Sequence, residues 1–220
     1  RKKFLLNEKN KKFSNLEKDK NLKKEFLSKI KKQKKSLLSS LESKKNVQKE
    51  IEQIINDLFK DKKEIKKREG ELAKIRSKLN KSTIGNFAKM KGKLPWPTEG
   101  NIINKFGLQK NNILNTVYEN IGIDIKTGTN AFVYSVLDGF ISKISYIDKN
   151  YGNIIILDHG GGYYTVYSNI DNIQVNEKDY VQALEKIAKV TKNESNEHIL
   201  HFEVWGNQEN LNPEIWLNKK

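Results

Sequence analysis

The sequence predicts an α + β protein in which the two classes occupy separate regions: an N-terminal α-helical coiled coil and a C-terminal, mostly antiparallel β domain. Three observations support this. Residues 1–84 contain no proline and a single glycine, Gly70. Apolar residues recur in that region at helical spacing. From Leu94 onward, prolines, glycines and short apolar runs replace the helical pattern. We therefore divide the chain into a helical region (1–85), a linker (86–98) and a β domain (99–220).

The positive charge of the protein is concentrated in the helical region. Residues 1–85 hold 28 Lys/Arg and 12 Asp/Glu, whereas the whole chain has a net charge of +15. One interpretation is a solvated helical surface, and the other is binding to nucleic acid or an anionic membrane. The basic residues are not interleaved with aromatic residues as in single-strand binding surfaces, and no nucleic-acid module is present. We therefore favour the solvated surface and expect no nucleic-acid partner.

Two apolar stripes predict at least two helices. The first stripe consists of Leu22, Phe26, Ile30, Leu37 and Leu41. The second has steps of three, four and seven residues, as in a heptad seam, with Ile51, Ile55, Leu58, Ile65, Leu72, Ile75 and Leu79. The pattern changes phase between Leu41 and Ile51, and Gly70 weakens the second stretch. We hypothesise that the first helix is one strand of a coiled-coil hairpin, and that a helix near residues 60–80 folds back on the β domain.

The absence of cysteine excludes disulfides and a thiolate zinc site. No apolar run is long enough to span a bilayer, and no signal peptide is visible. The chain begins at Arg1, within a helical pattern and without an initiating methionine. We therefore expect it to be a fragment, with any signal segment outside it.

The C-terminal region contains short strand-like runs that are separated by turn residues such as Asp138-Gly139 and Gly160-Gly161-Gly162. The predicted strands are 131–136, 140–147, 153–157, 163–167 and 199–204, and the segment 179–185 is ambiguous. No long helix is predicted here. This pattern is typical of a two-layer, mostly antiparallel β domain.

Several blocks of this region occur in the order and spacing of the LytM/lysostaphin-type zinc endopeptidases, and the chain resembles that family over about 130 residues. The blocks are Phe87 to Pro97, Ile103-Asn104-Lys105-Phe106-Gly107, Gly122-Ile123-Asp124-Ile125 with Gly128-Thr129, Val136 to Gly139, Tyr151-Gly152-Asn153, Leu157-Asp158-His159-Gly160 with Gly162-Tyr163 and Tyr167, Leu200 to Val204, and Asn212-Pro213 with Trp216-Leu217.

The resemblance implies a zinc site that has decayed. Active members hold Zn²⁺ through His-x-Gly-x-Asp and the last His of His-x-His, and further histidines assist proton transfer. Here these positions hold Asn120, Asp124, Asn169, Ile199 and His201. Alternate residues of a strand share a face, so neighbouring His198 points away and cannot replace the residue at 199. We expect no bound metal or other cofactor, and no catalysis.

A coiled coil followed by a degenerate LytM domain resembles the EnvC-like murein hydrolase activators. The resemblance implies a protein of the bacterial cell envelope, in the periplasm, that activates an N-acetylmuramoyl-L-alanine amidase during cell division and daughter-cell separation. The amidase would bind in the vestigial groove, and the coiled coil would contact a cell-division ABC-transporter complex. Peptidoglycan itself is a further possible partner. The groove residues that we expect to contact the amidase are Asp124, Tyr134, Tyr167, Asn169 and His201.

Three alternatives stay open at this point. The first is that the domain is an active zinc endopeptidase that cleaves peptidoglycan cross-links. The second is that it is a peptidoglycan-binding scaffold. The third is that Asp124 and His201 form only a satisfied polar pair and that the tyrosines only pack. A further hypothesis is that the helix near residues 60–80 occupies the groove as a restraining arm.

Overall fold

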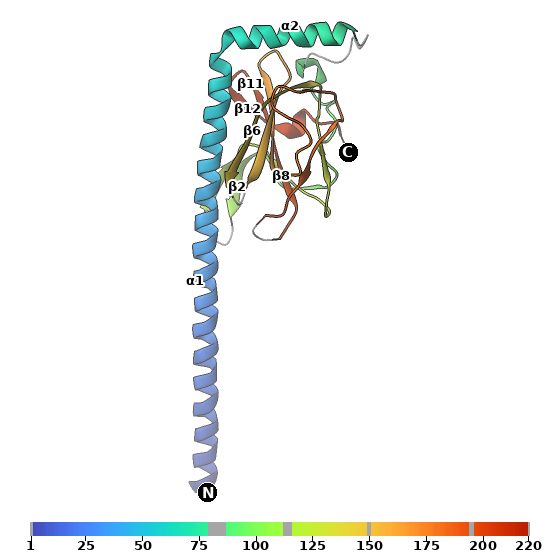
Figure 1. Cartoon of the computed structure of the whole chain (residues 1–220). Helices are drawn as coiled ribbons and strands as arrows, with labels where there is room; N and C mark the ends of the chain where they lie inside the picture. Colours follow the sequence, from blue (N-terminus) through green and yellow to red (C-terminus); the bar gives the residue numbers. More distant parts are fainter. Residues whose placement is uncertain (1, 79–86, 112–115, 149–150, 194–195, 220) are drawn as a thin grey trace.

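The computed structural model describes residues 2–78, 87–111, 116–148, 151–193 and 196–219. It contains a long helix, α1 (Lys2–Lys60), a shorter helix, α2 (Lys62–Lys78), and a C-terminal β domain. Figure 1 shows α1 as a straight rod, α2 running off sideways from its C-terminal end, and the β domain in the angle between the two helices. No helix in the described part of the chain is both long and apolar enough to cross a membrane. The α + β organisation predicted from the sequence is therefore confirmed.

The expectation of at least two helices is confirmed, but they separate at Asp61 and not between Leu41 and Ile51, where α1 runs without a break. The seam also keeps its phase. Its members are Leu37, Leu41, Lys44, Gln48, Ile51, Ile55 and Leu58, which alternate steps of four and three. Two polar residues occupy seam positions, and both contact the β domain: Lys44 Nζ lies 3.3 Å from Asp124 Oδ2, and Gln48 Nε2 donates to Glu119 O at 3.3 Å. What the sequence pattern indicated as a phase change is a polar contact.

The chain turns at Asp61, where α1 ends and α2 begins. The Asp61 carboxylate accepts a hydrogen bond from Glu64 N at 3.0 Å, which satisfies one of the amide groups at the start of α2. Gly70 lies inside α2 and does not end it. The corner therefore depends on a capping residue and not on the glycine.

The β domain is built mostly from antiparallel pairs. In the described part of the chain, the main sheet contains ten strands with the order β1-β4-β11-β8-β7-β6-β9, while β10 joins β5 and β8, β12 pairs with β11, and β2 and β3 form a separate hairpin. The bounds are β1 Asn101–Asn104, β2 Gly107–Asn111, β3 Thr116–Asn120, β4 Ile123–Lys126, β5 Phe132–Tyr134, β6 Gly139–Asp148, β7 Gly152–Asp158, β8 Tyr163–Asp171, β9 Tyr180–Val181, β10 Lys186–Val190, β11 Ile199–Gly206 and β12 Glu209–Leu211.

The five strands predicted from the sequence are confirmed as β5, β6, β7, β8 and β11, within a few residues at each end. The ambiguous segment 179–185 contains the two-residue strand β9. Short 3-10 helices, η1 (Phe87–Met90) and η2 (Pro213–Ile215), flank the sheet. Strands β1, β2, β3, β4, β10 and β12 were not among the five predicted strands, because each is only three to five residues long.

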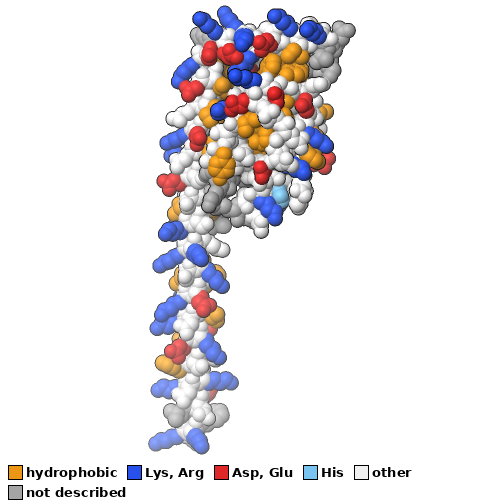
Figure 2. All heavy atoms as spheres, viewed as in Figure 1, with side chains coloured by type: hydrophobic (Ala, Val, Ile, Leu, Met, Phe, Trp, Pro, Cys, Tyr) orange, Lys and Arg blue, Asp and Glu red, His pale blue; other side chains and the backbone are white. Residues whose placement is uncertain are grey.

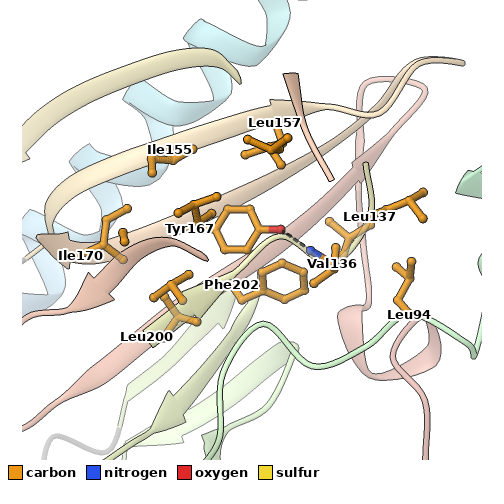
Figure 3. Packing of buried hydrophobic residues seen from close by; sticks show 14 of the residues in the cluster. Leu94, Val136, Leu137, Ile155, Leu157, Tyr167, Ile170, Leu200 and Phe202 are labelled. Carbon is orange, nitrogen blue, oxygen red and sulfur yellow. Dashed lines mark hydrogen bonds between the residues drawn. The ribbon is translucent and has the colours of Figure 1, made fainter. Parts of the chain in front are cut away.

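The main sheet separates two apolar layers. Along β7, Ile155 and Leu157 belong to the domain core, whereas Ile154 and Ile156 belong to a second cluster that includes α1 residues. Alternation of side chains along a strand produces this division. Figure 3 shows the core layer, in which Tyr167 and Phe202 pack against each other with ring centroids 5.3 Å apart.

The second layer attaches α1 to the sheet. Val47, Ile51 and Ile55 are almost completely buried. They belong to one cluster with the sheet residues Ile154, Ile156, Tyr164, Val166 and Trp205. Burial of an aliphatic side chain of this size contributes roughly 1.5–3 kcal/mol. The contact is therefore substantial, and the sheet face that carries the vestigial site is covered by α1.

The N-terminal half of α1 projects beyond the β domain (Figure 1). Phe13, Leu16, Phe26 and Ile30 are between 42% and 70% exposed there, so this part of the seam is not covered. Figure 2 shows basic side chains along the projecting rod.

Candidate functional site

Asp124 and His201 are brought together by the pairing of two neighbouring strands. Residue 124 of β4 lies directly opposite residue 201 of β11. His201 Nδ1 lies 2.5 Å from Asp124 Oδ1, and both residues are buried. Gly122 permits this close approach, because a Cβ at that position would lie 2.4 Å from the carbonyl oxygen of Phe202. The Gly-x-Asp segment therefore places its aspartate against His201.

The second nitrogen of His201 is also occupied. His201 Nε2 lies 3.1 Å from Glu203 Oε1, and Trp205 Nε1 donates to Glu203 Oε2 at 2.7 Å. Burial alone would lower the pKa of His201, but the two carboxylates raise it to about 9. The ring is therefore an imidazolium at neutral pH that donates to a carboxylate on each side.

Asp124 is held as an anion by three neighbours. Burial alone would raise the pKa of Asp124, but the charges of Lys44 and His201 and hydrogen bonds from His201 and Asn104 lower it well below its ordinary value. Asn104 Nδ2 donates to Asp124 Oδ2 at 2.8 Å. The carboxylate is thus ionised at every pH at which the protein is expected to work.

The residues present do not fit a catalytic zinc ion. Asn120 is fully buried, and its Nδ2 donates to the carbonyl oxygens of Gly122 at 2.9 Å and Lys105 at 3.1 Å. Its Oδ1 has no hydrogen-bond partner among the described residues, but a neutral amide oxygen is a poor zinc ligand. Ile199 offers no ligand atom. Asn169 donates from its Nδ2 to the Ile199 carbonyl at 2.5 Å.

The remaining acidic and histidine groups also do not converge on one point. His201 lies between two carboxylates, with one nitrogen toward each, so the three groups form a line. Within the described ranges, no three His, Cys, Asp or Glu residues are grouped so as to hold a metal ion. His198 comes directly before β11, its Nδ1 lies 3.4 Å from Val190 O, and it does not line the cavity beside Asp124 and His201, so it does not replace Ile199.

Lys44 is the site residue that sequence reasoning missed. Its ammonium lies 3.3 Å from Asp124 Oδ2, and the two side chains are only 16% and 10% exposed. The same ammonium lies 5.5 Å from the centre of the Tyr118 ring, within range of a cation–π interaction. The available signal was its position: a lysine at a seam position, in phase with apolar residues on both sides, indicates a charged group on whatever the helix covers.

A cavity of about 480 Å³ remains between α1 and the domain beside this contact. From the domain, its lining includes Asp124, Asn169 and His201 of the expected groove set, together with Tyr118 and Tyr151. From α1, the lining residues are Ser36, Leu37, Ser40, Leu41 and Lys44.

Two of the expected groove residues are elsewhere, and that part of the expectation is corrected. Tyr167 is fully buried in the domain core, where its hydroxyl oxygen accepts a hydrogen bond from Val136 N at 3.1 Å (Figure 3). Its register partner in β11 is Phe202, so it faces away from His201. Tyr134 lines a separate hollow with Trp96 and Leu184.

The helix that covers the vestigial positions is α1, so the hypothesis that the helix near residues 60–80 does so is wrong. α2 packs at another edge of the domain. Arg68 Nη1 lies 3.3 Å from Asp158 Oδ2, and Arg76 Nε lies 2.8 Å from Asp138 Oδ2. Glu69 accepts a hydrogen bond from Gly161 N at 2.9 Å. α2 therefore anchors the helical region to the domain without lining the cavity beside Asp124.

His159 belongs to this anchoring edge and not to the vestigial site. Its Nδ1 lies 2.9 Å from the carbonyl oxygen of Asp138, which can only accept, so Nδ1 carries the proton. Its Nε2 accepts a hydrogen bond from the Thr165 hydroxyl at 2.7 Å. Burial lowers the pKa of His159 to about 4, and the nearby charge of Arg76 acts in the same direction. The ring is a neutral structural group.

Comparison with known proteins supports the assignment of the β domain. Residues 118–213 match the family model described as Peptidase family M23. The match covers most of the β domain and agrees with the LytM-type family expected from the sequence blocks.

Two curated relatives match this part of the chain. The murein hydrolase activator NlpD of Escherichia coli is 30% identical over 125 residues, which cover 57% of this chain and 31% of NlpD. The cell division protein DipM of Caulobacter vibrioides is 30% identical over 119 residues, which cover 54% of this chain and 19% of DipM. This chain thus matches a third or less of the length of either relative.

A solved structure agrees at the level of the fold. A putative peptidase M23 from Pseudomonas aeruginosa superposes with a TM-score of 0.50 at 20% identity, covering 70% of this chain and 63% of that one.

Proposed function

We propose that this chain, whose C-terminal domain is of the M23 type, is a non-catalytic activator of peptidoglycan hydrolases. The observation that carries the proposal is a lysine at the expected metal position: the Lys44 ammonium lies 3.3 Å from Asp124, at a site where Asn120 points its amide N–H groups at backbone carbonyls. A domain with this arrangement keeps a groove but lacks the chemistry. The names of NlpD, a murein hydrolase activator, and DipM, a cell division protein, support the same proposal.

The partner that we propose is an N-acetylmuramoyl-L-alanine amidase, bound through the face that includes Asp124, Asn169 and His201. In the structure α1 covers this face, with Val47, Ile51 and Ile55 buried against it. Activation then requires α1 to leave, so that α1 acts as the restraining element. The free energy for its removal must come from the partner or from a pull on the projecting helix.

The uncovered seam on the N-terminal half of α1 supports a second contact. Phe13, Leu16, Phe26 and Ile30 lie in a strongly basic stretch and are exposed. We propose that this seam pairs with another helix and that it connects the protein to a cell-division ABC-transporter complex. By the same proposal the protein works in the periplasm of the bacterial envelope.

The experiment is dye release from labelled sacculi with a candidate amidase alone, the amidase plus this chain, and this chain alone with added zinc. The activator proposal expects release to rise only in the mixture. Release by the chain with zinc alone would favour the endopeptidase. Binding to sacculi without any stimulation would favour the scaffold.

A pair of α1 variants tests the restraint. Ile51→Asp places a charge in the apolar layer and should detach α1, because an unpaired buried charge costs several kcal/mol. Asn46→Asp introduces the same side chain on the exposed face of the same helix and is the matched control. We expect stimulation by Ile51→Asp to exceed that by the wild type, and stimulation by Asn46→Asp to equal it.

A further inference from the structure

The vestigial metal site carries an excess of negative charge that one lysine balances. Two carboxylates, Asp124 and Glu203, flank the single imidazole of His201. Even with that ring protonated, one negative charge is uncompensated within this buried group. The Lys44 ammonium, 3.3 Å from Asp124, supplies the missing positive charge.

The residues that contact this ammonium form a buried and oriented binding site. Asp124, His201 and Glu203 are 7%, 4% and 0% exposed. Asn104 donates to Asp124 Oδ2 at 2.8 Å, the same oxygen that Lys44 approaches, and so fixes its direction. The Tyr118 ring lies below the ammonium at 5.5 Å. An anion, an orienting amide and an aromatic ring are the elements that recognise a primary ammonium or a guanidinium.

We propose that the decayed zinc site is a binding site for a lysine or arginine side chain of a partner helix, with Lys44 as its resident occupant. This deepens the proposed function, on which it rests: the hydrolase segment that displaces α1 would present its own cation to Asp124. A competitor without a cation would leave Asp124 buried and partly unpaired, which disfavours its binding.

The contacts of α1 also predict the sequence pattern of a partner helix that would replace it. Val47, Ile51 and Ile55 follow Lys44 by three, seven and eleven positions and cover the sheet between Ile154 and Trp205. A replacing helix must cover the same apolar surface and neutralise the same charge. We therefore expect a cation followed by apolar residues at these three spacings.

The test uses the full chain carrying Ile51→Asp, in which α1 is loosened and the residues of this binding site are unchanged. The probe is a fluorescent synthetic peptide with the sequence of residues 36–60, and binding is followed by anisotropy. Two further peptides carry Lys44→Glu or Lys44→Arg. We expect the native and arginine peptides to bind with similar affinity, and the glutamate peptide to bind at least about tenfold more weakly.

A second variant assigns the preference to Asp124. With Asp124→Asn added to Ile51→Asp, the native and glutamate peptides should bind within about threefold of each other. Thermal melts of each variant verify that the β domain is folded, and the Asn46→Asp chain, with α1 in place, should bind every peptide weakly.

Equal binding of the lysine and glutamate peptides to the Ile51→Asp chain would overturn the proposal, as would an undiminished preference after Asp124→Asn or a lack of binding by all three peptides. Because the assay contains no hydrolase, its failure is distinguishable from a failure of dye release. Specific peptide binding without any hydrolase stimulation would retain the cation site and refute only the activator function.

Discussion

Arg76 reaches from α2 to Asp138, directly before β6, and its Nε lies 2.8 Å from the carboxylate Oδ2 although 62 positions separate the residues in sequence. The pair is largely buried, with the side chains 14% and 2% exposed. Arg76 Nη2 also donates to the carbonyl oxygen of His159 at 3.1 Å. One guanidinium thus ties α2 to two turns of the β domain.

Arg76→Met should lower the free energy of unfolding by about 3 kcal/mol, because it leaves the Asp138 carboxylate buried without its cation. Adding Asp138→Asn to Arg76→Met should recover part of that loss. Urea melts of the two single variants and the double variant measure the coupling. Lys74→Met removes a charge from the exposed face of α2 and should change stability by less than about 0.5 kcal/mol. Additive effects at 76 and 138 would contradict the pairing.

Ser40→Leu should hold α1 more tightly on the domain. Ser40 lines the cavity of about 480 Å³ beside Lys44, and a larger apolar side chain would fill part of it. We expect the variant to be more stable by about 1 kcal/mol and to stimulate the amidase less than the wild type does. Ser39→Leu is the matched control, since both serines are exposed on α1 and only Ser40 lines this cavity. The two variants would behave alike if the cavity were irrelevant to the restraint.

Stability should fall as the pH is lowered from about 6.5 to about 4, in part because of His159. The buried ring has its pKa lowered to about 4, whereas the unfolded chain regains the ordinary value of 6.5. Between these values the unfolded state binds a proton that the folded state does not, so protonation favours unfolding, by an amount on the order of 3 kcal/mol. Urea melts at several pH values should show a shallower acid slope for His159→Gln. An unchanged slope would assign the acid sensitivity to other groups.

Removal of divalent metal should leave the protein unaffected. Metal bound only to the folded state would raise its stability, so a chelator would lower the melting temperature of a true zinc protein by several degrees. Because His201 uses both ring nitrogens and Lys44 occupies the approach to Asp124, we expect EDTA to shift the melting temperature by less than about 1 °C. A larger shift, together with zinc in elemental analysis, would refute the reading of this site.

The sequence predicted the parts of this structure that depend on local pattern. The inner strands β7 and β8 are apolar runs bounded by glycine or turn residues, and they were found. Strand alternation alone placed residues 199 and 201 on one face, and the structure pairs His201 with Asp124 on β4. These inferences needed only the period of the side chains.

The predictions that failed concern residues whose environment depends on contacts between segments far apart in the sequence. Tyr167 was assigned to the groove, yet its face follows from its pairing with Phe202, which the sequence does not reveal. Lys44 and Gln48 looked like a break in the seam, because the polar groups that they contact are more than 70 positions away. A polar residue in an apolar stripe predicts a polar partner, but the sequence does not identify that partner until the covered surface is known.

The projecting part of α1 has a mechanical consequence. At 1.5 Å per residue, residues 2–36 form a rigid lever of about 50 Å beyond the covered face. A sideways load at its far end concentrates at the nearest attachment, so the helix would peel away in order, with the Lys44 contact parting first and the Ile55 contact last. α2 lies beyond the pivot at Asp61, so peeling would uncover the face while the protein stays tethered to whatever pulls on it.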